Sequence, residues 1–343
     1  MSGLFATKPL DKILGEAREE GQHGLKRVLG PLNLIALGIG AVIGAGIFVI
    51  TGSVAARFAG PSIILSFVLA GLGCAFAGLC YAELAAMIPV SGSAYTYAYA
   101  SMGELIAWII GWDLILEYAF SAATVASGLS GNLVSLLQDF GIHLPPRLIE
   151  TPGQELYFFQ GRWEVLTTIA PALKAAGLSA DSLPHVTAIF NLPAFIAVCV
   201  MTAILIVGVK ESANLNVVVV FIKLATVIIF IVIAAAYLWN HPQVASTNWH
   251  PFIPANTGTF GEFGWSGIAR GAASIFFAFI GFDAVSTAAQ EARNPQRDMP
   301  IGLLGSLAIC TVLYIAVSGL LTGVLHYSQL NVARSEEHTS ELQ

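Results

Sequence analysis

Three ionisable side chains, Glu117, Lys223 and Asp283, stand inside long apolar stretches of this chain. On insertion scales a charged side chain at the centre of a bilayer costs about 2.5–3.5 kcal/mol, so residues of this kind usually serve a function. Burial destabilises the charged form of an ammonium or carboxylate, which allows such a group to exchange a proton. The residue types therefore indicate ion or proton chemistry within a membrane.

Lys223 is the only lysine inside an apolar stretch. A lysine near the end of such a stretch can extend its ammonium to the membrane surface, which is the structural alternative here. Lys223 lies about eight residues from the start of its stretch, or ~12 Å of helix, which is longer than a lysine stem reaches. The position favours a functional role, for which we predict proton coupling.

Residues 33–52 are long enough to cross a bilayer, yet four glycines, Gly38, Gly40, Gly44 and Gly46, crowd their middle. About 20 apolar residues span the hydrocarbon core. Glycines spaced four apart let helices pack closely, which is one interpretation. The other is a broken helix, whose free backbone groups must be satisfied by protein, water or ligand. This stretch alone leaves the two interpretations equally open.

The composition places the chain among membrane proteins. Of 343 residues, 56% are hydrophobic and 10% are charged, whereas soluble domains carry about 25% charged residues. The four cysteines lie in apolar runs without metal or disulfide spacing, so we expect them to be buried and free. We therefore predict an all-α polytopic membrane protein.

The apolar pattern predicts seven spans, with a cytoplasmic tail over residues 1–32 and a long external loop over residues 138–190. The predicted spans are 33–52, 62–88, 103–137, 191–209, 215–239, 266–289 and 301–326. Lysine and arginine are concentrated in the tail and in the segments on its side of the membrane, which indicates a cytoplasmic amino terminus.

The sixth span repeats the anomaly of the first, because Gly281 and Asp283 stand in its middle. Two interrupted spans separated by four others suit two five-helix repeats of opposite orientation, which hold substrate at the midplane between the broken helices. We accordingly divide the chain into a first repeat, 33–240, and the start of a second, 241–327. Free N–H groups at a half-helix N-terminus would hold a carboxylate, and free carbonyls would hold an ammonium.

Four motifs carry a specific family resemblance: GIGAVIGAGIF from Gly38, GWDLILEY from Gly111, GVKES from Gly208, and FFAFIGFDAVSTAAQEARNPQRDMP from Phe276. Together they resemble the amino acid–polyamine–organocation (APC) superfamily, and more narrowly its cationic-amino-acid-transporter-like branch of bacterial permeases. The resemblance covers roughly residues 26–327.

The resemblance implies the leucine-transporter-type inverted-repeat fold and a secondary active transporter that takes up amino acids with protons. The predicted substrate contacts are Val42, Ile43, Gly44, Ala45 and Gly46 for the carboxylate, and the carbonyls of Phe277, Ala278 and Ile280 for the amine. Lys223 would occupy the place that a sodium ion takes in other members. Ala45 departs from the serine or threonine frequent in the family, so a hydroxyl ligand would be missing.

Asp113 and Glu117 are four residues apart and share one helix face. They are either a structural hydrogen-bonded pair or a substrate contact, with Glu117 the better candidate because it lies deeper. Asp283 and Arg270 are candidate gate residues.

Functions of other classes are less well supported by the sequence. An intramembrane enzyme lacks the HExxH and GxSxG motifs, and the histidines lie in loops or at span ends. A sensor or exchanger of the same fold stays open, because it would use the same pocket. We expect an amino acid and protons as ligands, no cofactor or metal, no nucleic-acid partner, and a location in the cell membrane, most simply a bacterial inner membrane. Association with a small membrane subunit is left open.

The last ten residues, 334–343 (RSEEHTSELQ), do not continue the apolar pattern. The same decapeptide is encoded in one frame by a common sequencing-library adapter. We interpret it as a non-native tail and expect the natural protein to continue, with further spans, beyond about Ala333.

Overall fold

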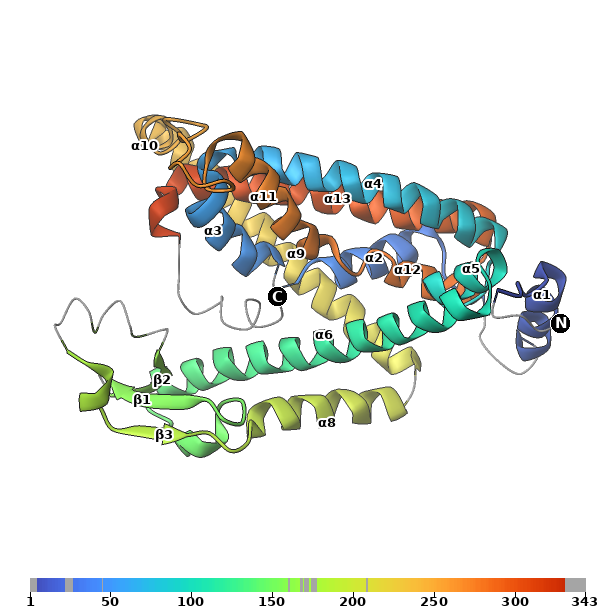
Figure 1. The fold of residues 1–343 in the computed structure, drawn as a ribbon, viewed down its shortest axis with the longest axis horizontal. Coiled ribbons are helices and arrows are strands. Elements are labelled where there is room, and N and C mark those ends of the chain that lie inside the picture. The colour runs from blue at the N-terminus through green and yellow to red at the C-terminus, as the bar shows by residue number, and fades with distance from the viewer. Residues whose placement is uncertain are drawn as a thin grey trace. The chain divides into compact units, whose positions relative to one another are not determined.

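The computed structural model describes residues 5–21, 27–44, 46–159, 161–166, 169, 173, 178–207 and 209–330. The chain divides into two compact units (Figure 1). The described residues of the first lie within 5–114 and 214–330, and those of the second lie within 115–213. Helices α6 and α9 each pass from one unit to the other.

Within the described residues, five helices are long and apolar enough to cross a membrane. They are Thr51–Met87, Glu104–Asp139, Val217–Asn240, Gly264–Thr287 and Pro295–Val324. Two shorter apolar helices, Pro31–Val42 and Leu192–Ile206, correspond to the first and fourth predicted spans. These helices confirm an all-α polytopic membrane protein.

The first unit contains most of the helices. In chain order they are α1 (Leu10–Gly21), α2 (Pro31–Val42), a π-helical turn (Gly46–Ile50), α3 (Thr51–Val54), a second π-helical turn (Ala55–Ala59), α4 (Ile63–Met87), α5 (Ser93–Ser101), the start of α6 (Glu104–Asp139), most of α9 (Val209–Asn240), α10 (Pro242–Asn248), α11 (Gly264–Phe276), α12 (Ala284–Thr287) and α13 (Pro295–Val324). The short helix α5 lies between the predicted second and third spans.

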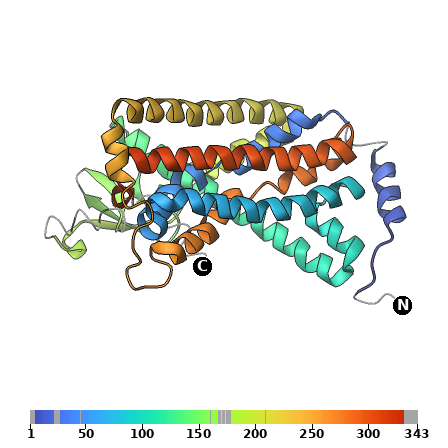
Figure 2. The same ribbon diagram turned by 90° about the horizontal axis from the view of Figure 1, so that it is seen from above.

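Helix α13 is the centre of the first unit's core. It runs alongside α4 in both views and also packs against α2 (Figures 1 and 2). Tyr314, Phe67 and Phe279 are among the largest side chains that the core buries completely. The core thus brings the predicted first, second, sixth and seventh spans together.

The second unit contains the rest of α6, a three-stranded antiparallel sheet and α8 (Leu192–Val207). The strands are β1 (Glu155–Phe159), β2 (Arg162–Val165) and β3 (His185–Thr187), in the spatial order β2-β1-β3. Leu156 on one face of β1 and Tyr157 on the other each join a separate buried cluster. The predicted loop 138–190 therefore contains a small folded sheet that apolar periodicity did not indicate.

The prediction that all four cysteines are buried is wrong for two of them. Cys74 and Cys310 are buried, whereas Cys80 and Cys199 are exposed, and all four are free thiols. Cys80 follows Leu79 on α4, and both side chains are exposed. An apolar run indicates that a cysteine lies in a membrane span, but it does not indicate which face of the helix the cysteine occupies.

Candidate functional site

The first predicted span is interrupted where the glycines gather. Helix α2 ends at Val42, and Ile43 adopts an extended ψ of 100° that turns the chain out of the helix. The chain becomes helical again at Gly46, in a π-helical turn. π-Helical turns occur frequently at functional sites. Ala45, one of the predicted carboxylate contacts, lies outside the described residues.

The sixth predicted span is interrupted in a matching way. Helix α11 ends at Phe276 and is followed by one 3-10 turn, after which Ile280 is extended with ψ of 138°. Gly281 has φ of +105°, a conformation that residues with a β-carbon rarely adopt. Both spans that the sequence identified as anomalous are therefore broken helices.

The two breaks lie directly against each other. A β-carbon added to Gly46 would stand 2.5 Å from the β-carbon of Ala278, and one added to Gly281 would stand 2.9 Å from the carbonyl oxygen of Ala41. Each break thus places a glycine against the other broken span. The sequence offered close packing and helix breakage as alternatives, and the glycines of this stretch serve both.

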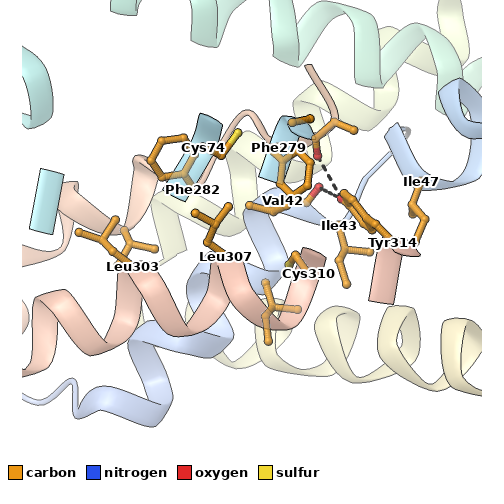
Figure 3. Close-up of a cluster of buried hydrophobic side chains, with 14 of the residues drawn as sticks. Val42, Ile43, Ile47, Cys74, Phe279, Phe282, Leu303, Leu307, Cys310 and Tyr314 are labelled. Atoms are coloured by element: carbon orange, nitrogen blue, oxygen red, sulfur yellow. Dashed lines mark hydrogen bonds between the residues drawn. The ribbon is translucent and has the colours of Figure 1, made fainter. Parts of the chain in front are cut away.

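Tyr314 on α13 joins the two breaks (Figure 3). Its hydroxyl oxygen lies 2.9 Å from the carbonyl oxygen of Val42 and 3.0 Å from that of Ala278. A phenol has one proton to donate, so the two carbonyls share it. The tyrosine ring packs against Phe67 and Phe279, with ring centroids 5.4 and 5.2 Å away.

Sequence analysis missed Tyr314, although a signal was present. It is the only tyrosine in the predicted seventh span, 301–326. A buried tyrosine hydroxyl needs a hydrogen-bond partner, and helix backbone groups are already paired. A lone tyrosine in an apolar span therefore indicates a hydrogen-bond acceptor nearby, such as a free carbonyl. Like Lys223, it is a polar group that an apolar span does not otherwise need.

Lys223 on α9 reaches the first break from another direction. Its ammonium donates hydrogen bonds to the carbonyl oxygens of Ile43, at 2.9 Å, and Gly40, at 3.2 Å. These carbonyls belong to the last turn of α2 and the residue after it, where helical partners are lacking. The ammonium thus holds the carboxyl end of α2, where cations are stabilised by the helix dipole.

The remaining predicted substrate contacts differ in their surroundings. Gly44 has open space on its side-chain face, since an added β-carbon would meet nothing within 4 Å. The carbonyl of Phe277 already accepts a hydrogen bond from the N–H of Ile280, at 3.3 Å. Ala278 offers its carbonyl to Tyr314. Of the predicted carboxylate contacts that the structure describes, Gly44 is thus the one with free space.

The candidate gate residues lie on opposite sides of the break in the sixth span. Asp283 is 8% exposed and directly precedes α12, where its side chain makes no capping hydrogen bond. Arg270 on α11 stacks on Phe58, its guanidinium carbon 4.2 Å from the ring centroid. This cation–π contact ties α11 to the second π-helical turn, Ala55–Ala59.

Glu117 lies on α6 in the second unit and is half-buried. Its contact with substrate stays a prediction. The part of the chain that the structure describes contains no group of three or more histidine, cysteine, aspartate or glutamate residues that could hold a metal ion.

Known proteins with similar sequences are transporters. The family described as amino acid permease matches residues 29–337. A methylthioribose transporter of Bacillus subtilis (strain 168) is 45% identical over 97% of this chain, and the branched-chain amino acid permease BcaP of the same strain is 44% identical over 95%. The vacuolar cationic amino acid transporter 4 of Arabidopsis thaliana is 33% identical over 96%.

The alignments cover 62%, 60% and 48% of the lengths of these three relatives, so the chain spans about three fifths of the two bacterial proteins. The names of the relatives are those of permeases and transporters, and none is that of an enzyme. With a family match over most of its length and two broken helices packed together at its core, this chain belongs to the amino acid permease family of the APC superfamily.

Proposed function

We propose that the full-length protein is a secondary active transporter that takes up an amino acid across the cell membrane, with its amino terminus in the cytoplasm. The observation that carries the proposal is the meeting of two broken helices, with Tyr314 and Lys223 bound to the carbonyls at the break. Backbone that leaves the helix inside a bilayer is tolerated where it is buried in protein or lines a cavity. Such paired breaks are the usual substrate site of inverted-repeat transporters.

The substrate is a zwitterion, and the two breaks would bind its two charges. The N–H groups of Gly44 and Gly46 lie at the start of the helical segment that begins at Gly46, and they would hold the carboxylate, with the open face of Gly44 as the approach. The carbonyls at Phe277, Ala278 and Ile280 would hold the amine. Tyr314 donates to the Ala278 carbonyl, and the second lone pair of that oxygen would accept the amine.

Lys223 would couple uptake to protons. As an ammonium it binds the carbonyls of Gly40 and Ile43 and holds the end of α2 in place. A neutral amine would bind these carbonyls more weakly, because hydrogen bonds from charged donors are roughly twice as strong as neutral ones. Loss of the proton would therefore free α2 to move, and Asp283 and Arg270 would act at the two gates.

The relatives' names indicate which substrates to test. They specify branched-chain amino acids, cationic amino acids and methylthioribose. Methylthioribose is the second candidate, because the relative so named is 45% identical. It has neither carboxylate nor amine, so it would not use the proposed charge contacts.

The experiment is uptake by the full-length protein in proteoliposomes, with labelled leucine, arginine and methylthioribose, with and without an inward proton gradient. Accumulation of an amino acid that depends on the gradient supports the proposal. Uptake of methylthioribose alone favours the second candidate. Binding without uptake would identify a sensor, and uptake that needs amino acid inside the vesicle would identify an exchanger.

A further inference from the structure

Arg270 on α11 lies on the same helix face as the start of the second break. It precedes Phe277 by seven residues, which is two helical turns, or about 10 Å along the axis. Ala273 lies between them on this face, and all three residues are exposed. The exposed face of α11 therefore leads from Arg270 to the carbonyls that the proposed function assigns to the substrate amine.

This face is suited to contact with water. A charged side chain within a membrane span almost always faces the interior of the bundle or a water-filled cavity, because contact with lipid is costly. Arg270 belongs to the span Gly264–Thr287. We therefore expect the face that carries it to line an aqueous approach to the second break.

Packing holds the guanidinium of Arg270 in one place. The ring of Phe58 covers one side of it through the cation–π contact described above. A β-carbon on Gly261 would stand 2.7 Å from Cδ of Arg270, so the missing side chain at this glycine leaves room for the arginine stem. The positive charge thus has a fixed position two turns from the break.

The charge of Arg270 is not neutralised by a carboxylate in the part of the chain that the structure describes. There Arg162 pairs with Asp139 at 2.6 Å, whereas Arg270 forms no ion pair. Glu262, the acidic residue nearest to it in the sequence, accepts a hydrogen bond from the hydroxyl of Thr257, at 2.8 Å. A fixed charge in a protein-lined space acts over about 10 Å, since the effective dielectric constant is well below that of water.

We propose that Arg270 is a specificity-determining residue that makes the approach to the second break positive and so disfavours substrates with a cationic side chain. This inference rests on the proposed function and assigns it a substrate class, amino acids whose side chain carries no positive charge. Such a zwitterion has no net charge, whereas free arginine or lysine carries one positive charge that the guanidinium repels. The structural alternative is an arginine that only packs α11 against Phe58.

The reactivity of a cysteine at position 273 measures this charge effect without requiring transport. Ala273→Cys is introduced into the full-length protein with the exposed Cys80 and Cys199 changed to serine, and the protein without the new cysteine is the blank. Anionic and cationic methanethiosulfonate reagents are then compared. We expect Arg270→Gln to lower the ratio of the anionic to the cationic reaction rate about tenfold. Arg147→Gln, at an exposed arginine of the loop before β1, is the matched control and should leave the ratio unchanged. An unchanged ratio in Arg270→Gln overturns the proposal.

Substrate competition separates charge selection from packing. We expect Arg270→Gln to strengthen the binding of arginine relative to leucine about tenfold in the full-length protein. Arg270→Lys should keep the wild-type preference, because lysine retains the charge but not the planar guanidinium. Equal changes for both substrates, with the same loss in Arg270→Lys, would identify a packing role and overturn the proposal. Tighter binding of arginine than of leucine by the wild type would also contradict it.

The two experiments fail independently of each other. If the wild type neither binds nor takes up any amino acid, the proposed function is wrong, and the reagent ratio still shows whether Arg270 makes this face positive. If amino acids are taken up but the reagent ratio and the substrate preference do not respond to Arg270→Gln, the proposed function stands and the role of Arg270 in specificity is wrong.

Discussion

Lys223 and Tyr314 supply the hydrogen bonds that a broken membrane helix lacks. Together they bind the carbonyls of Gly40, Val42 and Ile43 at the end of α2. An unpaired backbone carbonyl in a bilayer is costly, so these side chains make the break in the first span tolerable. Their donors differ in charge, because an ammonium is cationic whereas a phenol is neutral.

Lys223→Met should abolish the response of uptake to a proton gradient while binding and exchange are at least partly retained. Methionine keeps most of the apolar volume but can neither carry charge nor donate to Gly40 and Ile43. The measurement is proteoliposome uptake with and without an inward proton gradient, with Thr226→Val on the exposed face of the same helix as control. If the methionine variant responds to the gradient as wild type does, the coupling site lies elsewhere.

Tyr314→Phe should lower both stability and substrate affinity. The ring contacts with Phe67 and Phe279 remain, but the shared proton at Val42 and Ala278 is lost. Leaving buried carbonyls unpaired costs about 1–3 kcal/mol. Thermal unfolding in detergent measures the loss, with Tyr327→Phe, at a half-buried tyrosine in the turn that follows α13, for comparison. An unchanged melting temperature would mean that water replaces the hydroxyl.

At the scale of the elements, the two broken spans act as one packed pair. Gly46 touches Ala278, and Gly281 touches Ala41, so the backbone of each break limits the movement of the other. Gly44, two residues before Gly46, has open space on its side-chain face. Packing and substrate access are thus divided between neighbouring glycines of one short segment.

Two alanine substitutions in this segment should affect different properties of the protein, one its stability and the other its substrate binding. Gly46→Ala forces a β-carbon against Ala278 and should destabilise the protein by about 1–3 kcal/mol, as overpacking does. Gly44→Ala meets nothing within 4 Å, so it should leave stability nearly unchanged but weaken substrate binding. Thermal unfolding and equilibrium binding of the full-length variants distinguish the two. Strong binding by Gly44→Ala would move the carboxylate site away from this break.

The sequence predicted the helices that carry these groups better than it predicted which residues the groups contact. Apolar length and glycine clustering identified both broken spans, and charge at membrane depth identified Lys223, because these are properties of single segments. The contact of Tyr314 with two breaks could not be predicted, because it depends on how α13 crosses two other helices. The small sheet around β1 was missed because its strands are short and their apolar residues do not alternate regularly.

At the scale of the whole molecule, the chain belongs to the amino acid permease family but spans about three fifths of the length of its bacterial relatives. The proposed transport cycle combines the packed breaks and the charge of Lys223. Both act on α2: the second break limits where it lies, and Lys223 holds its carboxyl end.

The central claim is that the two breaks bind the carboxylate and the amine of one substrate. The most direct test is equilibrium binding to the full-length protein of the amino acid that is taken up fastest, of its amide, which lacks the carboxylate, and of its N-acetyl derivative, which lacks the charged amine. We predict that each derivative binds at least about 100-fold more weakly, the cost of leaving a charged contact unpaired. Binding of either derivative as tightly as the parent amino acid would contradict the account.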